Sequence, residues 1–200
     1  MATMPKDYYN HFDTNKHYQQ ILYRDGYVLQ GAELNEQQSA SLHRLRRVAD
    51  ALFKDGDVIR DAQLVVDSAT GEVKAQAGLV YIAGLVRDVP AATFLVGTEG
   101  TVVIGVRLAE KVISELDDAT LYNPAIGSRG EGEPGAWRLQ VTASWGHDAD
   151  GGTGEFYPVY IVDDAFCARK RPRRRWMRSR RASQHMTATA PQVERISFPD

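Results

Sequence analysis

The most regular pattern of hydrophobic and polar positions lies near the start of the chain and has helical spacing. From Ala32 to Phe53 no residue breaks a helix, and apolar or small residues return to one helical face. Lys54, Asp55 and Gly56 then supply a stop, with a glycine suited to a left-handed cap. We therefore predict a long amphipathic helix over 32–53, inside a helical segment 31–56. The apolar face consists of Leu34, Ser41, Leu42, Leu45, Val48, Ala49, Leu52 and Phe53.

The charges of this segment are arranged by sign. Glu33 and Glu36 lie in the first turn, where the positive end of the helix dipole favours acids. The opposite end is basic, which favours the negative end of the dipole, through Arg44, Arg46, Arg47 and Lys54. Both ends thus support the helix prediction.

Part of the same face follows the alternating four-three spacing of a coiled-coil seam. The seam positions are Gln38, Leu42, Leu45, Ala49 and Leu52, and Gln38 forms a polar layer that can fix register between parallel helices. Two interpretations stay open at this point. The helix packs on its own domain, or it is shared with other copies at a trimer axis.

The remainder of the chain has the texture of short strands separated by turn residues. Apolar runs occupy 62–66, 72–77, 79–87, 93–96, 101–108, 137–145 and 156–162. Between Trp137 and Trp145 apolar residues hold the odd positions and polar residues the even ones, so one face of that strand is predicted to be buried. The loops at 67–72 and 96–101 carry the polar residues and glycine of hairpins, whereas 117–136 has no period and is predicted to be a long loop.

These patterns predict an α+β fold class in four segments. Residues 1–30 form an extended, aromatic-rich N-terminal arm, and 31–56 contain the long helix. Residues 57–164 form a mainly antiparallel β domain, and 165–200 form a basic, disordered C-terminal tail.

Composition and charge narrow the class of protein. No apolar run approaches the roughly 18 residues that span a bilayer, and the N-terminus lacks the apolar core of a signal peptide. We expect that the chain is made in a cytoplasm and does not insert into a membrane. The single Cys167 excludes an internal disulfide framework. The net charge of −2 hides an acidic body and a tail with ten Lys/Arg against two acids.

The sequence contains no arrangement typical of catalysis. There is no nucleophile elbow, phosphate-binding loop or zinc-protease motif, and the five histidines are isolated. Asp148 and Asp150 are weak candidates for a calcium site, but a Gly/Asp-rich hairpin between Trp145 and Phe156 accounts for them without metal. We therefore expect no enzyme activity and no cofactor.

The basic tail suggests a different function. A run of arginines with one aromatic residue would bind nucleic acid through phosphate neutralisation and base stacking. The residues that would carry this binding are Arg173, Arg174, Arg175 and Trp176. The attached body is acidic, which is unusual for a protein that handles DNA.

Several segments, spread in order over residues 7–166, resemble an uncharacterised domain family of phage tail-fibre and baseplate proteins. They are Tyr8–Asp13, Tyr27–Gln30, Ala32–Glu36, Ala51–Asp57, Gly78–Gly84, Glu133–Ala136 and Gly154–Tyr160. The resemblance implies a long virion protein, and it brings no catalytic residues with it. After Asp164 the chain departs from the family pattern. A change of reading frame near Phe166 and Cys167 would account for the arginine-rich end.

The resemblance implies a non-catalytic structural component of a bacteriophage or prophage tail, a baseplate or tail-fibre attachment protein in the virion tail. Its partners would be other tail or baseplate subunits and further copies of itself, with a trimer as the expected form. The alternatives are a nucleic-acid-associated protein and an enzyme acting on host-surface glycan, which would need paired carboxylates. The expected interface residues are Tyr8, Tyr9, Phe12, Leu29, Leu34, Gln38, Leu42, Leu45, Ala49 and Leu52.

Overall fold

The computed structural model describes residues 3–165 and 167–170, and the predicted helix forms in it as α1 (Gly31–Leu52). The carboxylate of Glu33 accepts the N–H of Gln30 at 3.0 Å, which satisfies a free donor of the first turn. The helix ends because Phe53 is extended, although its N–H still bonds to the carbonyl of Ala49. Gly56 has a left-handed φ of 89° but lies beyond this end, so its predicted role as the helix cap is wrong.

The predicted fit to the helix dipole is half right. Glu33 lies in the first turn, but the last turn contains no basic residue. Arg46 instead pairs with Asp50 one turn on, at 3.4 Å. The charges therefore support the N-terminal end of the helix and not its C-terminal end.

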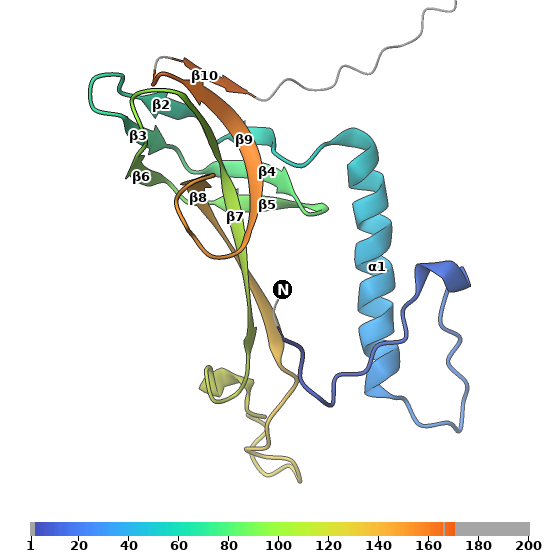
Figure 1. Ribbon diagram of the computed structural model, residues 1–200. Helices are drawn as coiled ribbons and strands as arrows, with labels where there is room; N and C mark the ends of the chain where they lie inside the picture. The colour runs from blue at the N-terminus through green and yellow to red at the C-terminus, as the bar shows by residue number, and fades with distance from the viewer. Residues whose placement is uncertain (1–2, 166, 171–200) are drawn as a thin grey trace, which may run out of the picture.

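The segment before α1 is extended, with one short 3₁₀ turn, η1 (Thr14–Lys16). Asp13 caps this turn by accepting the N–H of Asn15 at 2.9 Å. The chain then loops out and returns to begin α1 (Figure 1).

After α1 the described chain forms ten strands, and all the pairings between them are antiparallel. They are arranged in three sheets, ordered β1-β4-β5, β2-β3-β6 and β10-β9-β7-β8. The predicted α+β class is thus confirmed at the level of one helix with mainly antiparallel sheets. The strands are β1 (Asp57–Asp61), β2 (Leu64–Val66), β3 (Glu72–Ala75), β4 (Gly78–Ile82), β5 (Leu85–Val89), β6 (Ala92–Leu95), β7 (Thr101–Ile113), β8 (Arg138–His147), β9 (Glu155–Asp163) and β10 (Cys167–Lys170).

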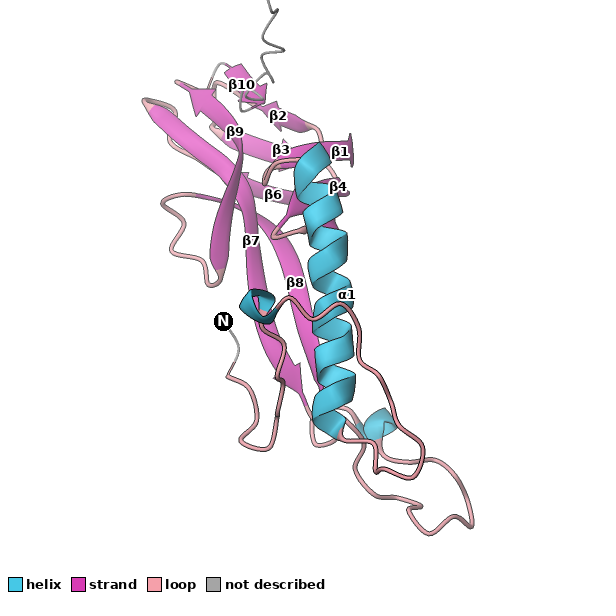
Figure 2. Ribbon diagram, turned by 90° about the vertical axis from the view of Figure 1, so that its right-hand side faces the viewer, coloured by secondary structure: helices cyan, strands magenta, loops and turns pink. Residues whose placement is uncertain are grey.

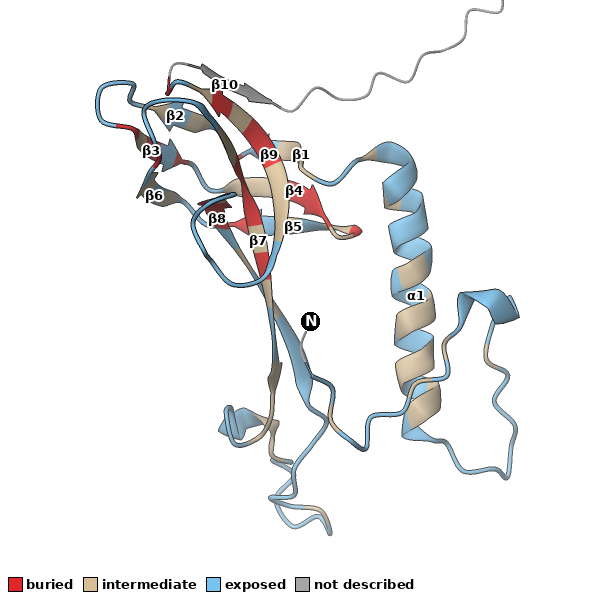
Figure 3. Ribbon diagram, in the orientation of Figure 1, coloured by how far each residue is buried: buried red, intermediate tan, exposed pale blue. Residues whose placement is uncertain are grey.

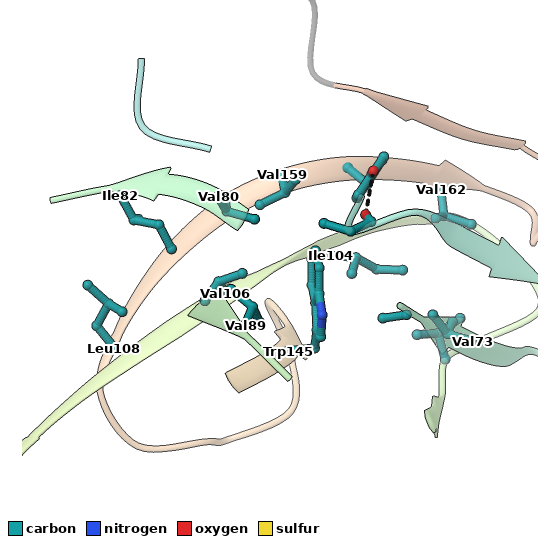
Figure 4. Close-up of a cluster of buried hydrophobic side chains, with 14 residues drawn as sticks. Val73, Val80, Ile82, Val89, Ile104, Val106, Leu108, Trp145, Val159 and Val162 are labelled. Carbon is teal, nitrogen blue, oxygen red and sulfur yellow. Dashed lines mark hydrogen bonds between the residues drawn. The ribbon is translucent and has the colours of Figure 1, made fainter. Parts of the chain in front are cut away.

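The core lies between the four-stranded sheet and the two smaller sheets (Figure 4). Two buried polar groups are satisfied across it: the Trp145 indole N–H donates to Gln76 O, and the Tyr160 hydroxyl donates to Ala62 O at 2.8 Å. No residue of α1 is part of this core. The largest fully buried side chains are Tyr81, Ile82, Ile104, Val73, Val80, Val89, Val106, Val159 and Val162.

The run 79–87, predicted as one strand, forms the two strands β4 and β5 with a tight turn between them. Ala83 and Gly84 form the turn with φ angles of 51° and 84°. The carboxylate of Asp55 accepts the N–H of Ala83 at 2.8 Å and stabilises this backbone. The run is apolar on both sides of the turn, so hydrophobic pattern alone did not reveal it.

One of three predicted hairpins is confirmed. Between β2 and β3, Asp67 accepts the N–H of Gly71, and its carboxylate accepts the N–H of Ala69. The loop 96–101 instead connects β6 to β7, which are in different sheets. The segment 147–155 is not a hairpin either, because β8 and β9 lie on opposite sides of β7.

The predicted alternation of β8 holds where the strand crosses the core. Val141 and Ala143 are half-buried and Trp145 is buried, while Thr142 and Ser144 are exposed. Further from the core, the paired strands β7 and β8 continue past the end of β9 as a two-stranded ribbon (Figure 2). There the apolar Leu139 is exposed, whereas Val112 and Ile113 of the paired strand are half-buried.

The predicted disordered tail of residues 165–200 is corrected at its start. Cys167–Lys170 form β10, which pairs with β9 from Asp163 to Tyr160. The remainder of the predicted tail, 171–200, lies outside the described residues.

We predict that Gly105→Ala destabilises the fold, because a Cβ there would lie 2.2 Å from the carbonyl oxygen of Tyr157 and 2.8 Å from the Phe156 ring. The expected loss in the free energy of unfolding is about 1–3 kcal/mol, measured by urea denaturation. Gly97→Ala is the control, because its Cβ would meet only Glu99 O, at 3.6 Å. Equal losses at the two positions would contradict this account of the β7–β9 contact.

Candidate interaction surface

One face of α1 is apolar and open to solvent. All of its leucines and its valine are exposed, by 45% at Leu34 rising to 71% at Leu52. Figure 3 shows that no part of α1 is buried. Gln38 and Ser41 are exposed on the same face. Isolated exposed leucines are common on proteins, but a continuous line of them along a helix marks an interaction surface. We call this face the α1 stripe: Leu34, Gln38, Ser41, Leu42, Leu45, Val48, Ala49 and Leu52.

The opposite face of α1 contacts the N-terminal arm. The Asn10 amide donates to the Ser39 hydroxyl at 2.7 Å, and the Asn35 amide donates to the carbonyl of Tyr9 at 2.9 Å. The Phe12 ring lies 5.5 Å from the His43 ring. Further along, the Tyr23 hydroxyl bonds to Gln37 and the Arg44 guanidinium to the carbonyl of Gln19. The arm therefore contacts the more polar face and the edges of the α1 stripe, and it leaves the leucines and Val48 of the stripe exposed.

The C-terminal end of α1 is joined to the β4–β5 hairpin. The Tyr81 hydroxyl donates to the Asp50 carboxylate at 2.6 Å, and the Phe53 and Tyr81 rings are 5.4 Å apart. Burial, followed by the bond to Asp50, raises the pKa of Tyr81 above its ordinary value. Arg46 lies against Gly84, where a Cβ would approach its side chain to 2.5 Å. Sequence analysis missed this joint, because nothing in the local pattern connects Asp50 to Tyr81.

Two hollows lie where the arm meets α1, and neither resembles a cofactor site. The first, about 190 Å³, is smaller than the usual 300–1,000 Å³ of small-molecule pockets and has Tyr18, Glu36 and Arg44 in its wall. The second, about 440 Å³, lies at the first turn of α1 and is walled largely by polar groups such as Asp7 and Asn35. Ligand pockets are mostly apolar, so the second hollow fits a contact between segments better than a bound small molecule.

The loop between β7 and β8, predicted to be long, is ordered by its own hydrogen bonds. The Asp117 carboxylate accepts the N–H of Ser114 and pairs with the Lys111 ammonium at 2.8 Å. The bond to Lys111 is the main reason that the pKa of Asp117 falls to about 2. Asp118 caps the short 3₁₀ turn η2 (Ala119–Leu121), and its bond to Thr120 lowers its own pKa. Two large apolar side chains nevertheless point to solvent, Leu116 at 86% and Ile126 at 91% exposed.

The segment proposed as a weak calcium site holds an ion pair. The Arg107 guanidinium Nε donates to the Asp150 carboxylate at 2.8 Å, and the N–H groups of His147 and Gly152 donate to the same carboxylate. Arg107 is the main reason that the pKa of Asp150 falls to about 2. In the described part of the chain no group of three or more His, Cys, Asp or Glu side chains could hold a metal ion. Asp150 thus closes the loop that passes from β8 to β9.

The structure separates the predicted interface residues into two groups. Leu34, Gln38, Leu42, Leu45, Ala49 and Leu52 share the α1 stripe, whereas Phe12 contacts His43 of its own chain. Tyr8, Tyr9 and Leu29 lie on the arm and are exposed. The candidate nucleic-acid residues Arg173, Arg174, Arg175 and Trp176 lie outside the described residues. None of the described helices has the length and apolarity needed to cross a membrane.

Comparison with protein families gives one match over most of the chain. The profile of a family described as a domain of unknown function, DUF4815, matches residues 7–178. The match begins at residue 7, where the resemblance in sequence was expected to begin. It ends at residue 178, twelve residues beyond the expected end at residue 166. Comparison with curated proteins gives no match.

Three solved structures are similar to parts of the chain. The baseplate complex from the type VI secretion system matches with a TM-score of 0.38 and 16% identity, over 77% of this chain and 40% of that chain. The TssK-TssF-TssG baseplate subcomplex matches with a TM-score of 0.39 and 13% identity, over 75% of this chain and 59% of that chain. TssK matches with a TM-score of 0.37 and 11% identity, over 76% of this chain and 40% of that chain. The chain therefore spans 40–59% of the length of these structures. TM-scores below 0.5 carry no conclusion about shared function.

We predict that Phe12→Ala loosens the arm, because it removes the ring that packs on His43. Amide hydrogen exchange of residues 3–30 should quicken, while exchange in β7 stays unchanged. Leu22→Ala is the matched control, because Leu22 lies on the same arm and is 72% exposed. Equal exchange in the two variants would mean that the Phe12 contact does not hold the arm.

We predict that Asp150→Asn lowers the free energy of unfolding at pH 7 by roughly 1–2 kcal/mol, after discounting for solvent at this partly exposed pair. Because the folded-state pKa is depressed, the carboxylate stabilises the fold above pH 4, and the benefit disappears as the pH falls from about 4 to about 2. Denaturation of both proteins across this range should show the difference shrinking. Asp148→Asn is the control and should change little. A calcium-induced rise in melting temperature that Asp150→Asn abolishes would instead favour a metal site.

Proposed function

The chain belongs to the DUF4815 family, and on that premise we propose that it is a non-catalytic structural component of a bacteriophage or prophage tail. Its role is that of a baseplate or tail-fibre attachment protein, located in the virion tail. The partners of such a protein are other tail or baseplate subunits and further copies of the chain. The resemblance of its N-terminal and central segments to phage tail proteins supports this class.

The observation that carries the proposal is the apolar stripe on a helix that stands outside the core. A chain that buried α1 for its own stability would cover Leu45 and Leu52, yet both are more than half exposed. Exposed aromatic and aliphatic side chains continue along the arm at Tyr9, Tyr27 and Val28. Large apolar surface on projecting elements is typical of proteins that join neighbours.

The ribbon of β7 and β8 supports the same role from the other side of the molecule. Its terminal loop is held by local bonds such as that from the Trp137 indole N–H to Glu115 at 2.8 Å. A loop with a preformed shape loses little conformational freedom when it docks. Leu116 and Ile126 on this loop are then suited to contact a neighbouring subunit.

Several carboxyl groups of the body have lowered pKa values, and each shift has a structural explanation. The pKa of Asp67 is lowered mainly by the N–H of Ala69 in the β2–β3 turn, and those of Asp117 and Asp150 by Lys111 and Arg107. Acidic side chains with shifted pKa values mark functional sites when they gather in a cleft. Here each one stabilises a separate turn or loop, which favours a structural role over glycan hydrolysis.

The alternative function is nucleic-acid binding through the arginine-rich tail. It depends on Arg173, Arg174, Arg175 and Trp176, with the acidic body playing no part. The two functions make opposite demands on the chain. Tail attachment requires residues 7–166, and nucleic-acid binding requires residues 167–200.

Fractionation of purified particles tests the proposal. Particles carrying the full chain are separated into heads and tails, and the chain is quantified in each by mass spectrometry. We expect it in the tail fraction, and removal of residues 171–200 should leave it there. Loss from the tail fraction upon this truncation, together with a steeply salt-dependent DNA affinity of the full chain at low salt, would establish the alternative.

A further inference from the structure

We propose that three copies of this chain pack α1 in parallel about a common axis, through the α1 stripe. The inference rests on the proposed structural function and names the partner of its main surface, which is a second copy of the chain. It is carried by four observations: the orientation of the stripe, its width, its self-complementary order of residues and the position of the nearby charges.

The orientation of the stripe is determined within the chain. The arm bonds to Ser39 on the far side of the helix and to Asn35 beside the edge of the stripe, and Asp50 bonds to Tyr81 at the C-terminal end. Turning the stripe toward the chain's own sheets would break these contacts. The helix is thus held in a rotation that presents Leu34, Leu45 and Leu52 outward.

The stripe is wider than the seam of a two-helix coiled coil. At 100° per residue its members extend over roughly 120° of the helix, from Val48 on one side to Leu42 on the other. A strict two-position seam is narrower. In a three-helix arrangement each helix faces two neighbours, so a broad stripe of this kind is buried.

The order of residues along the stripe favours a parallel arrangement. Gln38 and Ser41 lie together in its first half, whereas Leu45, Val48 and Leu52 fill the second half. In parallel register, glutamine meets glutamine and leucine meets leucine. An antiparallel arrangement about the middle of α1 would bury Gln38 against Leu45, which leaves amide groups without hydrogen bonds.

The charged residues of α1 do not oppose this arrangement, because they lie off the stripe. Arg44 donates to Gln19 O of the arm, and Arg46 pairs with Asp50. Glu33 accepts the N–H of Gln30 at the start of the helix. Like charges therefore need not meet at the common axis.

Sedimentation velocity of the full chain gives the copy number. We expect a species of three times the 22.2 kDa chain mass. Leu45→Glu should raise the dissociation constant at least about tenfold, because a charge would enter an apolar contact. Leu95→Glu is the matched control, the same substitution at a 67% exposed site on β6, away from α1, and should leave the mass unchanged.

Far-ultraviolet circular dichroism, followed through the thermal transition of each variant, separates a change of association from misfolding. At low concentration the spectrum of Leu45→Glu should equal that of the parent chain. A wild-type chain that stays monomeric or dimeric at high micromolar concentration would overturn the proposal. So would a trimer that Leu45→Glu leaves intact.

Cysteine cross-linking tests the orientation, in a Cys167→Ser background. Gln38→Cys chains alone should form disulfide-linked pairs if the helices are parallel and in register. Cross-linking that appears only when Gln38→Cys chains are mixed with Leu45→Cys chains would show an antiparallel arrangement and contradict the proposal.

The two proposals can fail separately. A monomeric chain that is still recovered in the tail fraction would overturn the trimer and leave the tail function. A trimer that depends on the α1 stripe but is absent from the tail fraction would overturn the tail function and leave the trimer.

Discussion

The strand β7 must satisfy two neighbours and the core at once, and the arrangement of the molecule depends on that constraint. One edge is bonded to β8 from Ile104 to Ile113, and the other is bonded to β9 from Thr101 to Leu108. Ile104, Val106 and Leu108 point from it into the core. Because β9 lies so close, only glycine fits at position 105, and the register shifts beside it.

A core organised in this way is complete without α1. The buried cluster draws on all three sheets, and the helix contributes none of its members. The leucines of α1 therefore lie outside the core and stay about half exposed or more, although burial of such side chains usually stabilises a protein. Amphipathic helices in globular proteins usually bury the apolar face. Here the arm covers the polar face, which reverses the usual arrangement.

Sequence predicted those features whose causes are local. The α1 helix follows from its 3.6-residue period and from Glu33 at its start, and the β2–β3 hairpin follows from Asp67 and Gly71. The alternation of β8 was visible because Val141, Ala143 and Trp145 face the core. The turn at Ala83 was missed, because it depends on Asp55, which is remote in sequence. Nor could the local pattern show that β8 and β9 flank β7, or which face of α1 the arm would cover.

The joint between α1 and the sheets has a structural consequence. The helix, about 33 Å long at 1.5 Å per residue, meets the β part at its last turn. There the Tyr81 hydroxyl holds Asp50, and the N–H of Gly56 bonds to Tyr81 O. Gly56 also lies so close to β9 that a Cβ would come within 2.2 Å of Pro158 O. The Tyr81–Asp50 bond thus ties α1 to β4, and the close approach of Gly56 ties the segment after it to β9, so the helix and two of the sheets share one junction.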